Sequence, residues 1–388
     1  MIIILQIIFW TIVFLVFHTY LGFPLILQIL SRNKKFNFKQ TYPQPKISVI
    51  MSLFNEESVI EQKLNSILNT NYPLEKIQII IGSDNSTDNT NTIVRNYAEK
   101  YPLIKFFEYN QRQGKSNVIN SMINKSDGEI IILTDANVFF DPQTINELIK
   151  PFSDPEIGLV DAKMVNTGLK KEGISIQEKT YISREVKIKN REGLLWGTMM
   201  GPFGGCFAIR RNLYSPVPYN FLVDDFYICM KVIQNKYKTI NNLDAIVFED
   251  VSNNLSDEFR RKVRIATGNF QNLWEFKRML WPPWKAVGFC FLSHKTLRWL
   301  TPVLIIISYI ICLILLFYNK FYLCLSIIYS SIFLLPLFDF ILKKLNIHNT
   351  FLRFITHFFS MNLALLTGMF KAMKGVKSNV WKPTKRNQ

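Results

Sequence analysis

The sequence predicts an α/β domain with a mainly parallel sheet at residues 46–280, between a transmembrane helix at residues 1–30 and membrane helices at residues 299–370. Three observations predict this architecture. Short apolar runs alternate with helical patterns in the central region, which is typical of parallel strands covered on both faces. Residues 2–30 contain no formal charge, and long apolar stretches dominate the C-terminal region. These stretches approach or exceed the roughly 20 residues that cross a bilayer.

The positive charge of the chain lies at its hydrophobic ends. The 388 residues are 48% hydrophobic and carry a formal net charge of +17, which suggests a nucleic-acid binder or a membrane protein. Residues 1–50 carry five cations and no acid, and residues 289–388 carry twelve cations against Asp339 alone. Removing these charges from the total leaves +1 for residues 51–288. The clustered basic charge of a nucleic-acid binder is therefore missing from the part that looks soluble.

The N-terminal hydrophobic segment indicates a retained anchor. It lacks the basic n-region and the small-residue cleavage site of a signal peptide. A basic linker follows directly at residues 31–45, and the positive-inside rule then places the central domain in the cytoplasm.

The C-terminal region begins with an interfacial segment at residues 281–298, where Trp281 and Trp284 resemble the tryptophans of a membrane surface. Two apolar spans follow, at residues 300–318 and 321–342, and they predict a hairpin with both ends on the cytoplasmic side.

The last apolar stretch, residues 351–370, leaves two alternatives open because Arg353, His357 and Asn362 interrupt it. If it crosses the membrane, the basic tail at residues 371–388 lies outside, against the positive-inside rule. An interfacial helix keeps that tail inside, and we favour this version slightly. Five cysteines, odd in number and without metal-ligand spacing, predict free thiols in a reducing compartment.

The central domain opens with four strand-length apolar runs, each followed by a turn or a helical pattern. Asn55 is expected to cap the first helix, with Glu56 and Glu57 in its first turn, where the helix dipole favours acids. The expected strands are residues 47–53, 77–82, 104–107 and 130–134, and a third helix is expected at residues 116–124.

Polar residues follow these strands, at positions where ligands bind in parallel sheets. They are Asn55, Glu56, Asp84, Asp135 and Asn137. No G-x-G-x-x-G turn follows a strand, and the sequence has no P-loop motif. A dinucleotide-binding site and a P-loop nucleotide site are therefore disfavoured.

Asp135 and Asn137 suggest a metal site. Two oxygen ligands at alternate positions can hold a Mg²⁺ or Mn²⁺ that bridges to substrate phosphates. An isolated D-x-N is more often a turn or a cap, but this one follows a buried strand on the same edge as Asp84.

The ordered set of motifs over residues 46–280 resembles the membrane-bound family-2 glycosyltransferases, which have a GT-A fold and include cellulose, hyaluronan and poly-N-acetylglucosamine synthases. The matching residues are 47–50, 55–57, 83–88, Lys115 with Asn120, 133–137, 204–211, Asp224-Asp225, 260–274 and the tail 381–386.

The resemblance implies roles for individual acids. Asp84 would contact the base or ribose of a uridine-type donor, near Asn55 and Glu56. Asp135 matches the first acid of the D-x-D motif, and Asn137 replaces the second. Asp225 matches the catalytic base of the T-E-D motif, with Asp224 in the Glu position. Adjacent acids can raise one another's pKa, which suits a base, although acids before a helix also act as caps.

A helix after residue 255 carries Arg261, Arg264 and Gln271 on one face by helical spacing. A solvated basic face is the ordinary explanation. The family instead has its Q-x-x-R-W motif here, so Arg264 would meet the diphosphate, while Arg261 replaces the Gln and Ile265 replaces the Trp. Loss of that Trp favours single transfer over processive synthesis.

Three other residues are expected near the donor or the acceptor. Gly204 and Gly205 let the backbone approach an acceptor, although tight packing explains two glycines equally well. Lys115 either contacts donor phosphates or lies on a loop.

The sequence thus predicts a metal-dependent, inverting glycosyltransferase that is anchored in the membrane with its catalytic domain in the cytoplasm. Its partners would be a nucleotide-diphosphate sugar, most simply a UDP-sugar, a glycan or lipid-linked acceptor of envelope or extracellular polysaccharide synthesis, and membrane lipids, with no nucleic acid. An inactive scaffold or regulatory subunit of the same fold is the alternative, because Asn137 and Ile265 depart from the family pattern. A transporter is disfavoured by the few ionisable residues in the spans.

Overall fold

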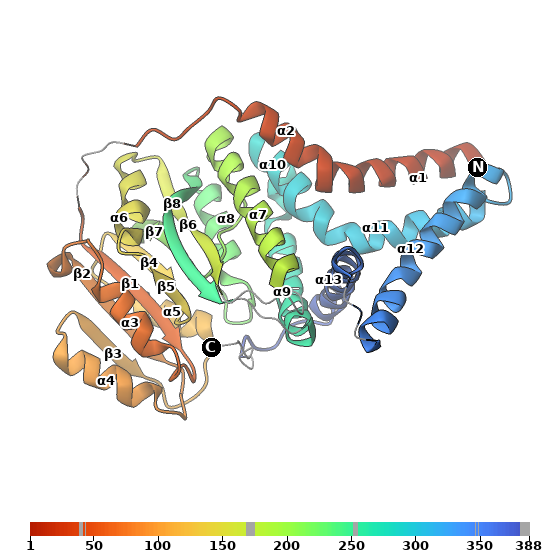
Figure 1. Cartoon of the computed structure of the whole chain (residues 1–388). Coiled ribbons are helices and arrows are strands. Elements are labelled where there is room, and N and C mark those ends of the chain that lie inside the picture. The colour runs from red at the N-terminus through yellow and green to blue at the C-terminus, as the bar shows by residue number, and fades with distance from the viewer. Residues whose placement is uncertain are drawn as a thin grey trace.

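A mixed eight-stranded sheet forms the centre of the computed structural model, which describes residues 1–38, 42, 44–167, 175–250, 255–345, 347 and 349–380. The strand order is β3-β2-β1-β4-β7-β6-β8-β5 (Figure 1). The strands are β1 (Ile47–Leu53), β2 (Ile77–Ser83), β3 (Ile104–Glu108), β4 (Ile130–Thr134), β5 (Val138–Phe140), β6 (Ile157–Thr167), β7 (Cys206–Arg210) and β8 (Lys238–Asp250).

Helices cover both faces of this sheet, as the alternation of strands and helices predicts. The domain helices are α3 (Ile60–Leu68), α4 (Thr90–Lys100), α5 (Lys115–Ile123), α6 (Thr144–Ile149), α7 (Ser175–Trp196), α8 (Asp224–Gln234) and α9 (Leu255–Phe276). Helices α3, α4 and α6 pack on one face, and α5 and α8 pack on the other.

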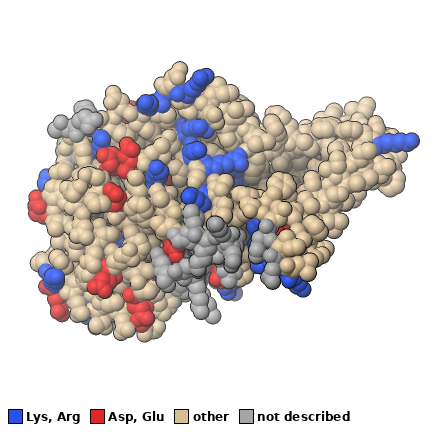
Figure 2. Space-filling model, viewed as in Figure 1, with Lys and Arg blue, Asp and Glu red and all other residues tan. Residues whose placement is uncertain are grey.

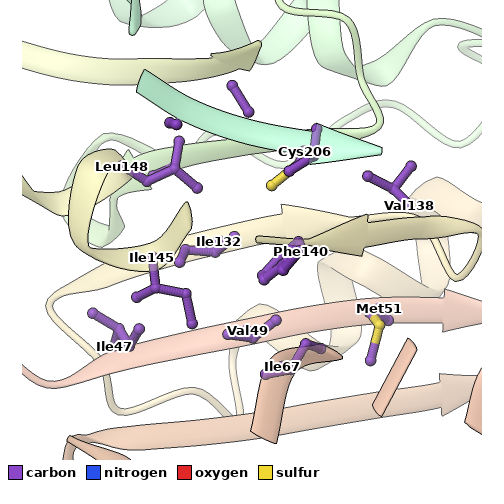
Figure 3. Close-up of a cluster of buried hydrophobic side chains, with 14 of the residues drawn as sticks. Ile47, Val49, Met51, Ile67, Ile132, Val138, Phe140, Ile145, Leu148 and Cys206 are labelled. Carbon is purple, nitrogen blue, oxygen red and sulfur yellow. The ribbon is translucent and has the colours of Figure 1, made fainter. Parts of the chain in front are cut away.

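The first four strands form the parallel half of the sheet. β1 pairs with β2 and β4, and β2 pairs with β3, all in parallel. Side chains alternate along β1, so that Val49 and Met51 meet Ile67 of α3, while Ile50 faces the opposite cluster (Figure 3). Burying each such side chain stabilises the fold by roughly 1.5–3 kcal/mol. All four predicted strands are confirmed to within one residue.

The second half of the sheet is mixed. β7 runs antiparallel to β4 and β6, β8 runs parallel to β6, and β5 runs antiparallel to β8. This half places the segments around residues 204 and 225 next to the parallel edge.

The expectation for Asn55 as a helix cap is wrong. Helix α3 begins at Ile60, its N-cap is Val59, and no side chain caps it. Asn55 instead has a φ of 55°, a left-handed conformation that Asn tolerates better than most residues. The side chain is consequently free to bond to the loop after β2.

Three apolar helical segments are long enough to cross a membrane within the described ranges. They are Ile2–Leu30, Ala286–Leu315 and Lys320–Lys344. The first comprises α1 (Ile2–Phe17), η1 (His18–Gly22) and α2 (Phe23–Leu30); the second comprises α10 (Ala286–Cys290), η6 (Phe291–Thr296) and α11 (Leu297–Leu315); the third is α12 (Lys320–Lys344).

These helices project away from the sheet domain (Figure 1). Most of the projecting surface carries neither Lys, Arg, Asp nor Glu on the face seen in Figure 2. The second span begins at Ala286, earlier than the expected residue 300, because the segment after Trp284 is already helical.

Helix α13 (Thr350–Met373) is not among the candidate spans of the described chain. It packs along α9, where Gly368 lies against Ala266 and Thr267. Two of the residues that interrupt its apolar pattern make polar contacts inside the protein. Arg353 pairs with Asp339 at 3.3 Å, and His357 Nε2 forms a hydrogen bond with Glu178 Oε1 at 2.7 Å. The tail motif at residues 381–386 lies outside the described residues, and the predicted domain boundaries stay predictions.

Candidate active site

The carboxyl ends of β1, β2 and β4 open into one cavity of about 940 Å³. Parallel strands end at the same edge, so residues distant in sequence meet there. Of the predicted site residues, the cavity is lined by Asn55, Glu56, Asp84, Lys115, Asp135, Asn137, Gly204, Asp224, Asp225, Arg261 and Arg264. Gly205 and Gln271 do not line it.

Asn55 organises the loop that follows β2. Its Oδ1 accepts a hydrogen bond from the Thr87 amide at 2.8 Å, and its own amide donates to Ser86 Oγ at 3.1 Å. The neighbouring Glu56 amide donates to Thr90 Oγ1 at 2.8 Å. These bonds join the β1 and β2 loops into one wall of the cavity.

Asp84 is buried, with 2% of its surface exposed, and its carboxylate is fully engaged. It accepts bonds from the Gln113 and Gly114 amides, at 2.6 and 3.0 Å, and from Arg112 Nε at 3.1 Å. Gly114 has a φ of 84°, which glycine adopts without strain. Asp84 thereby fixes the turn that begins helix α5 and carries Lys115.

Lys115 joins two acids from different parts of the fold. Its Nζ lies 2.7 Å from Asp135 Oδ1, at the end of β4, and 4.0 Å from Asp224 Oδ2, at the start of α8. Although burial disfavours the ammonium, the carboxylates of Asp135 and Asp224 hold the pKa of Lys115 above its usual value. The lysine is therefore a charged group inside the site, and the alternative of an ordinary loop lysine is wrong.

Asp225 begins α8 with Asp224, and its environment differs from that of an exposed carboxylate. Burial, followed by the negative charge of Asp224, raises the pKa of Asp225 to about 7, against the opposing charge of Lys115. Gly204 has a φ of 76°, and a Cβ there would lie 2.2 Å from Asp225 Oδ2. A glycine is required at this position because the backbone passes directly over the acid. A Cβ on Gly205 would instead meet Met164, so that glycine serves packing.

The residues of the D-A-N segment fit a divalent cation by their chemistry. Asp135 Oδ2 has no hydrogen-bond partner among the described residues, and its side chain is 34% exposed to the cavity. Asn137 Nδ2 donates to Glu249 Oε1 at 3.2 Å, and that bond does not use the amide oxygen. No group of three or more His, Cys, Asp or Glu in the described ranges could hold a metal alone. One carboxylate and one amide oxygen suit an ion that takes its remaining ligands from substrate phosphates and water.

Helix α9 supports the loop that leads into Asp224. Gln271 accepts a bond from the Leu222 amide at 3.2 Å and donates to Asn220 O at 2.9 Å, and Arg264 Nη1 lies 3.5 Å from Leu222 O. Arg261 pairs instead with Glu258, at 3.0 Å. Gln271 does not line the cavity and is thus a positioning residue for the loop before Asp224, whereas Arg264 lines the cavity.

Sequence reasoning missed two buried lysines. Lys63 of α3 is fully buried, donates to Thr134 Oγ1 at 2.9 Å and to Val138 O, and lies over the Phe140 ring. It therefore holds the backbone on both sides of the D-A-N segment. Lys189 pairs with Asp161 at 2.5 Å, and Asp161 accepts the Phe203 amide at 3.2 Å. The sequence contains one sign of the pair of Lys189 with Asp161, because Asp161 is an acid within the apolar run of β6.

Comparison with known proteins identifies the domain. Residues 48–217 match the family model of glycosyl transferase family 2. The chain contains a family-2 glycosyltransferase domain. The chain also shares its fold with the mannosyltransferase PcManGT from Pyrobaculum calidifontis, solved in complex with GDP-Man and Mn²⁺. The TM-score is 0.70 at 21% identity, and the match covers 94% of this chain and 99% of that one. This similarity confirms the predicted GT-A fold.

Three curated relatives match this chain at 22–28% identity. The probable glycosyltransferase YdaM of Bacillus subtilis (strain 168) is 28% identical over 58% of this chain and 55% of its own. A poly-beta-1,6-N-acetyl-D-glucosamine synthase of Staphylococcus epidermidis is 24% identical over 68% and 64%. A beta-monoglucosyldiacylglycerol synthase of Synechocystis is 22% identical over 62% and 51%. The chain matches about half to two thirds of the length of these relatives.

Lys63 predicts a pH dependence of stability. Burial lowers its pKa to about 7, so the unfolded chain binds one more proton than the folded chain between pH 7 and about 10. The free energy of unfolding of the parent should therefore rise with pH in this window, by on the order of 1 kcal/mol per pH unit, relative to Lys63→Met.

Thermal or denaturant unfolding of the detergent-solubilised chain at pH 7, 8 and 9 measures this difference. The matched control is Lys46→Met, because the pair of Lys46 with Asp127 is about half exposed. Parallel pH profiles for the parent and Lys63→Met would contradict the lowered pKa of the buried Lys63.

Proposed function

We propose that this chain is a membrane-anchored, inverting glycosyltransferase that uses a nucleotide-diphosphate sugar, with UDP as the favoured nucleotide, and a glycan or lipid-linked acceptor. One observation carries the proposal: Lys115 contacts both Asp135 and Asp224, so the acid expected at the donor diphosphate and the acid pair expected at the acceptor share one cavity. Transfer requires these two functions side by side.

The donor would lie along the edge formed by β1, β2 and β4. Asn55, Glu56 and Asp84 belong to the wall next to β2, where the nucleoside is expected, and Arg264 and Lys115 bring positive charge to the diphosphate. Guanidinium and ammonium groups form strong hydrogen bonds to phosphate oxygens. In this proposal, a Mg²⁺ or Mn²⁺ held by Asp135 and Asn137 would neutralise the charge that develops on the leaving diphosphate.

Asp225 is the proposed general base. The acceptor hydroxyl oxygen forms a bond to the anomeric carbon as the bond from that carbon to the diphosphate oxygen breaks. The hydroxyl proton moves to Asp225, and the nucleoside diphosphate leaves. A single displacement inverts the anomeric carbon. A carboxylate with a pKa near 7 is a better base at neutral pH than an ordinary aspartate, because catalytic groups work best when their pKa matches the working pH.

The apolar helices support a location in the cell membrane, with the domain on the cytoplasmic side as the flanking cations predict. The names of two relatives, a poly-beta-1,6-N-acetyl-D-glucosamine synthase and a beta-monoglucosyldiacylglycerol synthase, support a glycan or a lipid acceptor in envelope or extracellular polysaccharide synthesis. Gly204 and Arg261, which line the cavity beyond Asp225, belong to the acceptor side of this proposal.

An inactive scaffold of the same fold is a second candidate. The observation that favours it is the presence of Asn137 and Ile265 in the cavity, where the family resemblance implies an acid and a Trp.

Asp225→Asn tests the base. We expect kcat to fall by about 10²–10⁴-fold, because proton transfer by a positioned group contributes this much. In the parent, kcat/KM should rise with pH through about 7, since only the carboxylate form of Asp225 accepts a proton. The measurement is nucleoside diphosphate release and product mass with a panel of nucleotide sugars. Asp244→Asn, an exposed acid outside the cavity, is the matched control. Full activity in Asp225→Asn contradicts the assignment, and no activity of the parent with any donor favours the scaffold.

Removal of divalent cations should abolish transfer, and Mn²⁺ or Mg²⁺ should restore it in the parent. Asp135→Ala should lose activity at every metal concentration tested, because it removes the sole carboxylate of the D-A-N segment. The assay is transfer after EDTA treatment and metal titration. Undiminished activity in EDTA would show that the cations of Lys115 and Arg264 are sufficient for the diphosphate.

A further inference from the structure

The cavity continues from the predicted site to the membrane helices, and its far end has two chemically different sides. One side is cationic and consists of Arg184 of α7, Lys295 of η6 and Arg298 of α11. The other side comes mainly from α13, through the apolar side chains of Phe354, Phe358, Met361 and Leu365 and the polar His357 and Asn362, with Trp299 of α11. We refer to the three cations as the basic cluster.

The basic cluster has more positive charge than the acid beside it. Glu185 accepts Lys295 Nζ at 2.5 Å and Arg298 Nη1 at 2.6 Å, and it also meets His294 Nε2 at 2.9 Å. Arg184 forms no ion pair with any residue in the described ranges. One carboxylate therefore faces three permanent cations.

The other acid at this end of the cavity is already neutralised. Glu178 pairs with Lys262 at 3.1 Å and with His357 at 2.7 Å. It thus supplies no charge to Arg184. Figure 2 shows Lys and Arg gathered on this face, over α7 and its junction with the projecting helices.

The positive charges of Arg184 and Arg298 also repel one another. Burial, followed by the like charge of Arg298, lowers the pKa of the Arg184 guanidinium. Two guanidinium groups held near each other with insufficient acid form a site that an anion stabilises, and the planar fork of arginine matches the oxygens of a phosphate.

We propose that this end of the cavity binds a membrane lipid through a phosphate in its head group, with the phosphate on the basic cluster and the hydrocarbon chain against Phe354 and Phe358. The proposal rests on the proposed function in one respect, which is that the lipid carries the acceptor hydroxyl. A free phosphate would leave the aromatic side without a contact, and an uncharged lipid would leave the basic cluster without a counter-charge.

The basic cluster is placed to bind the phosphate of the lipid and not the hydroxyl that reacts. Arg184 and Asp225 line the same cavity. A lipid with its phosphate at Arg184 would therefore extend its head group along this cavity toward the base. The reacting hydroxyl would be farther along the head group, at Asp225.

Binding measured without any nucleotide sugar tests the subsite separately from catalysis. The probes are dioctanoyl phosphatidylglycerol, dioctanoylglycerol and inorganic phosphate, titrated into the detergent-solubilised full chain carrying Asp225→Asn and followed by tryptophan fluorescence or thermal shift. We expect the phospholipid to bind at least 10-fold more tightly than either of the other probes. Similar affinity for the phospholipid and the diglyceride, or phosphate binding as tight as that of the phospholipid, would overturn the proposal.

Arg184→Gln supplies the residue test, because the side chain is exposed at the cavity and makes no ion pair in the described structure. It should weaken phospholipid binding about 10-fold and leave diglyceride binding unchanged. Arg191→Gln, on the same helix but outside the cavity, is the matched control. Unchanged phospholipid binding in Arg184→Gln would overturn the subsite even if the parent transfers sugar, whereas normal lipid binding by a parent without transferase activity would overturn only the proposed function.

Discussion

An ammonium group between carboxylates holds the predicted centre together. Asp135 ends a strand in the parallel half of the sheet, and Asp224 begins a helix more than 80 residues later. Lys115, from a third element, contacts both acids and lowers the repulsion between them. Water screens a partly buried pair of this kind less than a surface pair, and removal of one partner would leave an uncompensated charge in the site. Lys115 therefore links the proposed donor side to the proposed acceptor side.

Hydrogen bonds from buried or partly buried polar side chains hold the loops of the site in place. Asp84 holds the turn before Lys115, Lys63 holds the backbone around the D-A-N segment, and Gln271 holds the loop before Asp224. Loops at strand ends are otherwise the mobile parts of a fold. Each of these groups is buried or partly buried and has hydrogen-bond partners, so each positions its loop without leaving its own buried polar atoms unsatisfied.

The sequence predicts the parallel half of the sheet well because its strands are short, apolar and regularly separated by helices. It also indicates which acids gather at the strand ends, since that follows from parallel topology alone. Asn55 is mispredicted because the same residue type serves as a helix cap and as a left-handed turn residue, and local pattern does not separate the two.

The contacts of Lys63 and Lys115 could not be predicted from the sequence. Both depend on long-range packing that brings α3, α5 and α8 to one edge, and a lysine in a helix is ordinarily solvated. The same limit applies to Glu185, whose partners Lys295 and Arg298 come from the second apolar span. The likeness to PcManGT over nearly the whole chain fits this view, in which the apolar helices and the sheet domain form one fold.

The cavity gives a physical reason for the membrane helices to belong to the fold. They supply one end of the space in which the proposed acids lie. In the proposed function, an acceptor held in or at the bilayer would reach the donor through this space.

The most direct test of a centre organised by Lys115 is a double-mutant cycle on kcat/KM with Lys115→Met, Asp224→Asn and the double variant. If the lysine and the acid act as one unit, the double variant should lose little more than the worse single variant. Losses that multiply would show that the two residues act independently and would contradict the account.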